Sequence, residues 1–399
     1  MTKIDETILK RYADVIIKFA LNDYKGINKG DKVYVRIPEA AREFLPYLQK
    51  SILESGGHMI LEYIPDGILR DFFDVGSVDQ LSYTPKKYVR SLISECDHVV
   101  RILSESDPKQ LEGIDPKLIM LRQKNLGFFR SLMQQKENKG KLTWNISLFP
   151  TKAMAKEAKM TLEEYWEEIV HACFLDETDP VSKWREVTKQ VEDTKSKLNK
   201  LDIKTLNVLG DGVDLSIGLG EKRIWAGGGG RNIPSFEVFT SPDCREADGY
   251  ISFSEPLYIY DNLVDGITLT FKDGKVVKAS ASKGEKVLKQ MISEKGANRL
   301  GEFSLTDKRL SRIHRFMAET LFDENTGGKY GNMHLALGQS FPECFSEGTK
   351  DYTTKTAKKY GFNESHVHTD IVTRKDRTVT AILRDGSKKV IYKNGEFTL

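Results

Sequence analysis

The pattern of apolar residues changes once along this chain, near residue 200, and this change constrains the fold more than any other feature. Before it, alternating runs such as Lys32–Ile37 and His58–Tyr63 are separated by segments with apolar residues at helical spacing, such as Glu39–Glu54. After it, short alternating runs follow one another with tight turns between them. Strands that alternate with helices form parallel sheets, whereas strands joined by tight turns form antiparallel ones. The sequence therefore predicts two domains of different class.

Residues 1–200 are predicted to form an α/β domain with a mainly parallel sheet. A helix is expected over Asp5–Asp23, ahead of the first strand, and two connecting helices at the domain's end. The remaining elements expected here are a helix at Pro85–Cys96, strands at Val99–Leu103, Leu118–Leu121 and Trp144–Phe149, and the connecting helices Leu162–Ala172 and Val181–Leu198.

Residues 201–399 are predicted to form a β-rich α+β domain. Its hairpins are marked by Asp273-Gly274, Asp385-Gly386 and Asn394-Gly395, dipeptides that favour tight type I′ turns. One helical insertion is expected over Gly284–Phe303, and one long turn-rich excursion over Leu321–Gly361.

Charge and composition exclude several classes of protein. Lysine and arginine number 61 against 58 acidic residues, and a net charge of +3 disfavours a nucleic-acid partner. No apolar run approaches the roughly 18 residues of a membrane span, and the first residues lack a signal-peptide core, so we expect a cytoplasmic protein. The four cysteines lack CxxC spacing, which disfavours disulfides and thiolate zinc sites.

Two histidines in the second domain are candidate metal ligands. His368 begins the triplet His368-Thr369-Asp370, and alternate residues of an extended segment project to one face, so His368 and Asp370 can reach the same ion. His334 follows a glycine-rich turn that comes after the acidic residues Asp323 and Glu324, so the chain could fold around a cation there. A surface strand with polar side chains is the competing interpretation, and His366 extends that alternation.

Three carboxylates add to this set. Glu324 follows two large apolar residues in Leu321–Asn325, which fits either a cation-binding loop or an ordinary exposed turn. Glu237 and Glu302 lie among apolar neighbours, and each is either a buried carboxylate that is paired, protonated or metal-bound, or an outward-facing strand residue. Together, four carboxylates and two imidazoles in one domain suit two adjacent divalent ions.

Other catalytic motifs are absent from the sequence. The run Ala226–Arg231 contains four glycines but matches neither GxGxxG nor GxxxxGK[ST], and we interpret it as a flexible loop without a bound organic cofactor. No GxSxG motif occurs, and the cysteine contexts suggest no nucleophile.

Several longer segments, taken in order, carry a family resemblance. They are KGDKVYVRIP, WNISLFPTKAMA, LDETDPVSKW, DLSIGL, RNIPSFEVFTSP, GANRLGEF, TLFDEN, HLALGQSFP and ESHVHTD. With these segments the whole chain resembles the thermophilic-type metallo-aminopeptidases, the family of aminopeptidase T, aminopeptidase S and PepS-like enzymes. The resemblance implies an N-terminal α/β domain, a β-rich C-terminal domain carrying two co-catalytic metals, and a homodimer.

Carried over residue by residue, the resemblance implies six metal ligands. They are Glu237, Glu302, Glu324, His334, His368 and Asp370. Glu302 is the expected catalytic carboxylate at the attacking water, as a bridging ligand or a general base. Asp323 is either a partner that orients a ligand or a simple turn acid.

This chain departs from the family pattern at two places. The turn Thr326–Met333 is longer than in family members, and Phe341 stands where the family often has a tyrosine whose hydroxyl can polarise the substrate carbonyl. A phenylalanine cannot donate this hydrogen bond, so the contribution is absent or comes from another group.

The expected activity is hydrolysis of the first bond of peptides with a free amino terminus, with Zn²⁺, Co²⁺ or Mn²⁺ as the metals. Two alternatives stay open. One is a dinuclear hydrolase of another bond, such as a phosphoester, and the other is a catalytically weak or inactive homologue that binds peptides and metal.

Overall fold

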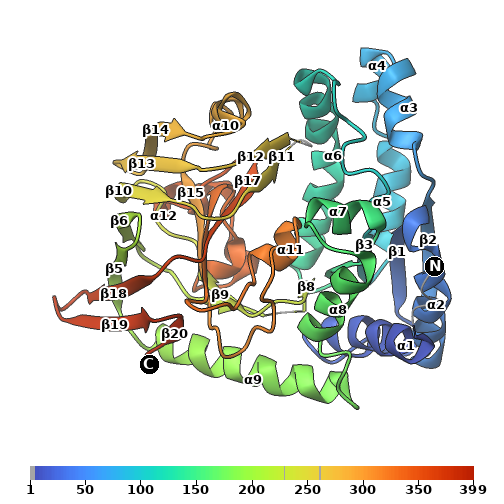
Figure 1. Ribbon diagram of the computed structural model, residues 1–399, viewed down its shortest axis with the longest axis horizontal. Helices are drawn as coiled ribbons and strands as arrows, with labels where there is room; N and C mark the ends of the chain where they lie inside the picture. The colour runs from blue at the N-terminus through green and yellow to red at the C-terminus, as the bar shows by residue number, and fades with distance from the viewer. Residues whose placement is uncertain (1–4, 229, 260–261) are drawn as a thin grey trace. The chain divides into compact units, whose positions relative to one another are not determined.

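The computed structural model describes residues 5–228, 230–259 and 262–399. By its contacts the chain divides into two compact units (Figure 1). The first runs to Glu186 and also takes in the segment that ends at Ser235, and the second comprises Val187–Gly228 and Phe236–Leu399. The division therefore falls within helix α9 (Pro180–Asn199), and a short later segment returns to the first unit.

The first unit is built on a parallel sheet of five strands in the order β2-β1-β3-β4-β8. All four pairings are parallel, as the alternation of strands and helices predicts. The strands are β1 (Lys32–Pro38), β2 (His58–Ile64), β3 (His98–Leu103), β4 (Thr143–Leu148) and β8 (Asn232–Ile233).

The helices of this unit connect its strands, as parallel pairing requires. The α-helices are α1 (Glu6–Val15), α2 (Leu45–Glu54), α3 (Ile68–Val75), α4 (Val78–Ser82), α5 (Lys86–Glu95), α6 (Pro116–Glu137), α7 (Lys152–Glu157) and α8 (Leu162–Ala172). A π-helical turn (Ile16–Ala20) continues α1, and a 3₁₀ turn (Glu39–Phe44) leads into α2.

The strand predicted at Leu118–Leu121 is wrong, because these residues form the first turns of α6. The Asp115 carboxylate caps this helix by accepting the Lys117 N–H at 2.9 Å. Farther along the helix, Phe129 and Leu132 pack against a core cluster that includes Tyr34. An apolar run of four residues cannot by itself distinguish a strand from a buried helical turn.

The sequence does not predict strand β8, which directly follows the glycine-rich run. It adds to β4 through the pairs Ile146↔Asn232 and Ser147↔Ile233. A Cβ on Gly230 would lie 1.9 Å from the Ala20 carbonyl oxygen, so the backbone can approach this closely only without a side chain. Gly230 therefore packs closely against Ala20, while Gly229 of the same run lies outside the described residues.

The second unit contains a large antiparallel sheet, in the order β14-β13-β10-β6-β5-β18-β19-β20. Its strands are β5 (Ile203–Gly210), β6 (Val213–Gly218), β10 (Ala247–Ser252), β13 (Thr268–Lys272), β14 (Lys275–Ser280), β18 (Arg377–Leu383), β19 (Lys388–Lys393) and β20 (Glu396–Phe397). The three predicted hairpins are present as β13-β14, β18-β19 and β19-β20 (the last two red in Figure 1).

A second antiparallel sheet has the order β17-β16-β15-β9-β7. Its strands are β7 (Ala226–Gly227), β9 (Glu237–Thr240), β15 (Leu300–Thr306), β16 (Asn332–Gly338) and β17 (His368–Thr373). One apolar cluster joins the two sheets, with Val208 and Leu215 from the large sheet and Phe303, Leu335 and Ile371 from the smaller one. The predicted fold class, α/β followed by a β-rich domain, is confirmed.

The smaller elements of this unit correct two further expectations. They are the hairpin β11-β12 (Leu257–Ile259 and Asn262–Val264), the helices α10 (Glu285–Ile292), α11 (Thr320–Asp323) and α12 (Thr354–Tyr360), and the 3₁₀ turns Pro342–Cys344 and Thr349–Asp351. The helical insertion ends at Ile292, because Leu300–Phe303 belongs to β15. The turn-rich excursion contains β16, a fully buried strand.

Candidate metal centre

Five of the six candidate ligands lie on one face of the smaller antiparallel sheet of the second unit, β17-β16-β15-β9-β7. Side chains alternate along each strand, so Val238, Phe303 and Ile371 face the apolar core while their neighbours face the other side. The five are Glu237 on β9, Glu302 on β15, His334 on β16, and His368 and Asp370 on β17. The sixth, Glu324, is the residue directly after the short helix α11.

A β-bulge turns Glu302 toward this face. Leu300 faces the core and pairs with Leu337, and in a regular strand Glu302 would point the same way. The register shifts between Leu300 and Glu302, which reverses the alternation. Gly301 permits the shift, since a Cβ there would lie 2.3 Å from the Gln339 carbonyl oxygen.

The six side chains converge in one cluster of overlapping groups. Ligand atoms within 4.8 Å of one another form three sets, namely Glu237–Glu302–His334, Glu302–His368–Asp370 and Glu324–His334–Asp370. Each set shares members with the other two. The structure therefore brings together all six residues that the resemblance implied.

Glu302 spans the two imidazoles with different oxygens. Its Oε1 lies 3.2 Å from His334 Nε2, and its Oε2 lies 3.3 Å from His368 Nε2. Asp370 Oδ1 lies 3.4 Å from His368 Nε2 and 3.9 Å from His334 Nε2. A carboxylate placed in this way has the geometry of a bridge between two positions.

Two of the candidate ligands, His368 and Glu237, are oriented by hydrogen bonds to groups outside the six. His368 Nδ1 lies 2.8 Å from the Gln339 carbonyl oxygen, which accepts only if Nδ1 carries the proton, so a neutral His368 ring would present the Nε2 lone pair to a bound ion. The Ser304 hydroxyl donates to Glu237 Oε2 at 3.1 Å. Sequence reasoning missed Ser304, although its place two residues after Glu302 puts it on the same face.

Burial and mutual repulsion disturb the titration of the cluster. Burial and the neighbouring Glu302 raise the pKa of Glu237 to about 7, and burial raises the pKa of Glu324 well above its ordinary value. Burial alone would lower the pKa of His334, but Glu302, Glu237 and Asp370 raise it to about 10. Burial also opposes ionisation of Asp370, yet His368 and His334 lower its pKa.

This set of donors fits divalent cations. Asp370 Oδ1 is buried and makes no hydrogen bond within the described residues. Four carboxylates in one buried cluster repel one another unless they are protonated or neutralised, and bound cations supply the missing positive charge. Carboxylate and imidazole donors together suit first-row divalent ions.

Asp323 belongs to none of the three groups of ligand atoms, and its carboxylate supports the loop that precedes Glu324. Its carboxylate accepts the N–H groups of Met317 at 2.7 Å and Glu319 at 3.0 Å, and burial raises its pKa well above the ordinary value. The turn Thr326–Met333 is held as well, since Gly327 N–H donates to the Ile313 carbonyl at 2.9 Å.

Phe341 lies directly against the cluster. Its ring centroid is 4.7 Å from that of His368 and 5.4 Å from that of Phe239, both edge to face. The Ser241 hydroxyl accepts its backbone N–H at 2.8 Å. The phenylalanine ring therefore packs on a candidate ligand.

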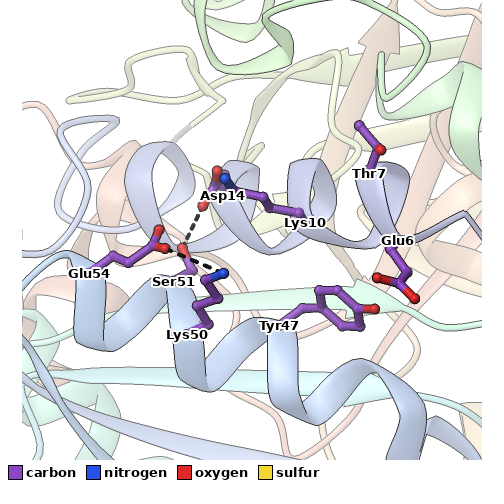
Figure 2. A pocket seen from close by; sticks show the side chains of 8 residues that line it. All are labelled: Glu6, Thr7, Lys10, Asp14, Tyr47, Lys50, Ser51 and Glu54. Carbon is purple, nitrogen blue, oxygen red and sulfur yellow. Dashed lines mark hydrogen bonds and ion pairs between the residues drawn. The ribbon is translucent and has the colours of Figure 1, made fainter.

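A pocket on the first unit, between α1 and α2, is lined by residues of mixed charge (Figure 2). Its Ser51 hydroxyl donates to Asp14 at 2.8 Å, and Lys50 pairs with Glu54 at 4.0 Å. None of its residues belongs to the ligand cluster, and the carboxylates of Asp14 and Glu54 also pair with Lys18.

Comparison with known proteins shows the family of this chain. The model of the thermophilic metalloprotease family M29 matches residues 5–397. The chain belongs to this family. An M29 protein is a metal-dependent peptide hydrolase, and a donor cluster of carboxylates and imidazoles is what such an enzyme requires.

The M29 relatives match over nearly the whole chain. Aminopeptidase PepS of Streptococcus thermophilus is 29% identical, with 98% of each chain covered. Aminopeptidase AmpS of Bacillus subtilis and aminopeptidase T of Thermus thermophilus are each 28% identical at the same coverage. The solved structure of wild-type AmpT from Thermus thermophilus matches with a TM-score of 0.83 and 26% identity, covering 98% of this chain and 99% of that one. The predicted family resemblance is confirmed.

Across the described residues, no helix is both long and apolar enough to cross a membrane. All four cysteines are free thiols.

Proposed function

We propose that this M29 metalloprotease is an aminopeptidase that hydrolyses the first peptide bond of peptides with a free amino terminus, using two divalent metal ions. The observation that carries the proposal is the position of Glu302, whose two oxygens approach two different imidazoles. Relatives named aminopeptidases, matched along nearly their full length, support the choice of reaction.

We assign six ligands to the two ions. Glu237, Glu302 and His334 form one group and Glu302, His368 and Asp370 the other, with Glu324 close to His334 and Asp370. Six donors exceed what one tetrahedral catalytic ion with an open position can use. All six lie in residues 201–399, which we propose as the catalytic domain.

Bound divalent ions at such a site lower the pKa of water from about 15.7 toward 7 and polarise the substrate carbonyl. The chain's own residues have separate parts. Glu302 is the carboxylate at the attacking water, and its contacts with both imidazoles favour the bridging role over that of a free base. The His368 tautomer, set by the Gln339 carbonyl, keeps Nε2 available as a ligand.

The donor set also suits a substrate with a free amino terminus. Two divalent ions would balance the charge of the four carboxylates, and the lone pair of a neutral terminal amine could bind one of the ions. Acetylation removes this nitrogen as a donor and adds bulk at the same position. This difference favours an exopeptidase over an enzyme that cuts within a chain.

The finer properties belong to the same proposal. We propose Zn²⁺, Co²⁺ or Mn²⁺ as the metals, because an imidazole and carboxylate set accepts each of them. We also propose a homodimer, following the family resemblance, and a cytoplasmic location, which the four free cysteines support.

The test is a matched pair of substrates. Purified protein is incubated with Leu-Gly-Gly and with N-acetyl-Leu-Gly-Gly, and free leucine is measured before chelation, after chelation, and after each metal is restored. We expect metal-dependent release from the free peptide alone. Cleavage of the acetylated peptide would refute the exopeptidase assignment, and metal binding without any turnover would favour the inactive homologue.

A further inference from the structure

Asn325, the residue after the candidate ligand Glu324, is fully buried and uses both ends of its side-chain amide. Its Oδ1 accepts the backbone N–H of Phe236 at 2.7 Å, and Phe236 directly precedes the candidate ligand Glu237. Its Nδ2 donates to the Leu321 carbonyl at 3.2 Å and lies 3.5 Å from Glu324 Oε1. One amide therefore joins two chain segments that each carry a candidate ligand.

The surroundings hold this amide in place. The Asn325 backbone N–H donates to the Phe322 carbonyl at 2.9 Å, and the Ser311 hydroxyl donates to the Asn325 carbonyl at 2.5 Å. The Asn332 amide donates to the Asp323 carbonyl at 2.6 Å and so ties the same turn to β16, the strand of His334. Because the Asn325 side chain is held in place by these contacts, it can fix the positions of the two segments that it joins.

The chemistry of the two contacts requires an amide. Oδ1 must accept a hydrogen bond while Nδ2 donates one, and among side chains of this size only asparagine offers both. Aspartate would accept at both ends and place a further negative charge beside Glu324. Leucine would leave the Phe236 N–H buried without a partner.

We infer that Asn325 is a positioning residue that fixes Glu237 and Glu324 relative to each other and so prearranges the metal site. The inference rests on the proposed function, because it assumes that these two carboxylates bind metal. Groups that orient metal ligands typically change metal affinity by about 10- to 100-fold when they are removed.

The experiment measures metal affinity in the full-length protein. Chelated protein is titrated with Co²⁺, followed by its visible absorption, for the wild type, Asn325→Leu and a control, Asn145→Leu. Asn145 is also a buried asparagine that bridges segments, with Nδ2 2.7 Å from the Gly230 carbonyl and Oδ1 accepting from Ser147, but it touches no candidate ligand.

We expect Asn325→Leu to weaken Co²⁺ binding about 10- to 100-fold and to alter its absorption spectrum. The control should lower the melting temperature and leave Co²⁺ affinity unchanged. If Asn325→Leu does not fold, Asn325→Ser replaces it, because serine is too short to span both contacts.

Folded Asn325 variants that bind Co²⁺ within twofold of wild type would overturn the inference. Equal loss of affinity in the control would do the same, since it would show a general effect of stability. If the wild type binds neither Co²⁺ nor, by elemental analysis, Zn²⁺ or Mn²⁺, the proposed function fails first, and the two failures are thereby distinguished.

Discussion

Replacement of Glu302 by glutamine tests the candidate centre most directly. Glu302 is only 3% exposed and contacts both imidazoles. The amide has nearly the same shape, so packing is preserved while the negative charge is lost. We expect a small effect on the stability of the metal-free protein and a large effect on the metal-loaded protein.

In the metal-free protein the change should cost little. Hydrogen bonds to a charged group contribute about 1.5–3 kcal/mol each. The glutamine weakens these hydrogen bonds, but it also removes the negative charge of Glu302, which repels Glu237 and Glu324 and raises their pKa values. Because these effects oppose each other, we expect the free energy of unfolding to change by less than about 2 kcal/mol.

In the loaded protein the loss should be large. Both groups of ligands share Glu302, and removal even of a group that only orients a ligand weakens metal binding up to about 100-fold. At saturating metal this removes about 2.7 kcal/mol of stabilisation, or roughly 5–10 °C in melting temperature for a unit of this size. Turnover should fall by about 10²–10⁴-fold.

The assay combines melting curves, with and without metal, and leucine release. A matched control is Glu255→Gln, because Glu255 is also buried in the second unit but pairs with Arg374 at 2.8 Å. The control should reduce stability in both states while the metal-induced shift persists. A Glu302→Gln variant that keeps the wild-type metal shift and most of its activity would refute the role assigned to Glu302.

Three further predictions follow from particular groups. Elemental analysis of fully active protein should find two divalent ions per chain, and one ion would contradict the dinuclear assignment. Phe341→Tyr should raise turnover at unchanged metal content, by less than the roughly 10²–10³-fold that one transition-state hydrogen bond can supply; unchanged turnover with a lower melting temperature would show a packing residue. In the first unit, burial opposes ionisation of Asp31, but the hydrogen bonds from His98 at 3.0 Å and from Asn28 hold its pKa below 3.8. Its contribution of about 1–2 kcal/mol should therefore be full above about pH 5 and lost as the pH falls through the lowered pKa, so urea unfolding of Asp31→Asn and wild type should differ at pH 7, and the difference should shrink as the pH is lowered through that pKa.

The sequence by itself determined the local geometry of the fold. Asp273-Gly274 and Asn394-Gly395 adopt positive φ at both residues, as their hairpins require. Alternation along β17 likewise places His368 and Asp370 on one face. These features depend only on residues that are adjacent in the chain, so they can be predicted from the sequence alone.

Where local signals were ambiguous, the prediction failed. Leu118–Leu121 reads equally as a strand or a buried helical turn, and packing of α6 on its core cluster made it helical. The two-residue strand β8 is too short to leave a periodic signal. Its place in the sheet depends on close approach of Gly230 to Ala20.

Only the tertiary structure decided how the site is assembled. The bulge at Gly301, which turns Glu302 away from the core, arises from the pairing of β15 with β16. The contact of Asn325 with Phe236 joins segments far apart in the chain. Such contacts depend on strand register and on distant partners, and neither is recorded in the order of residues along one strand.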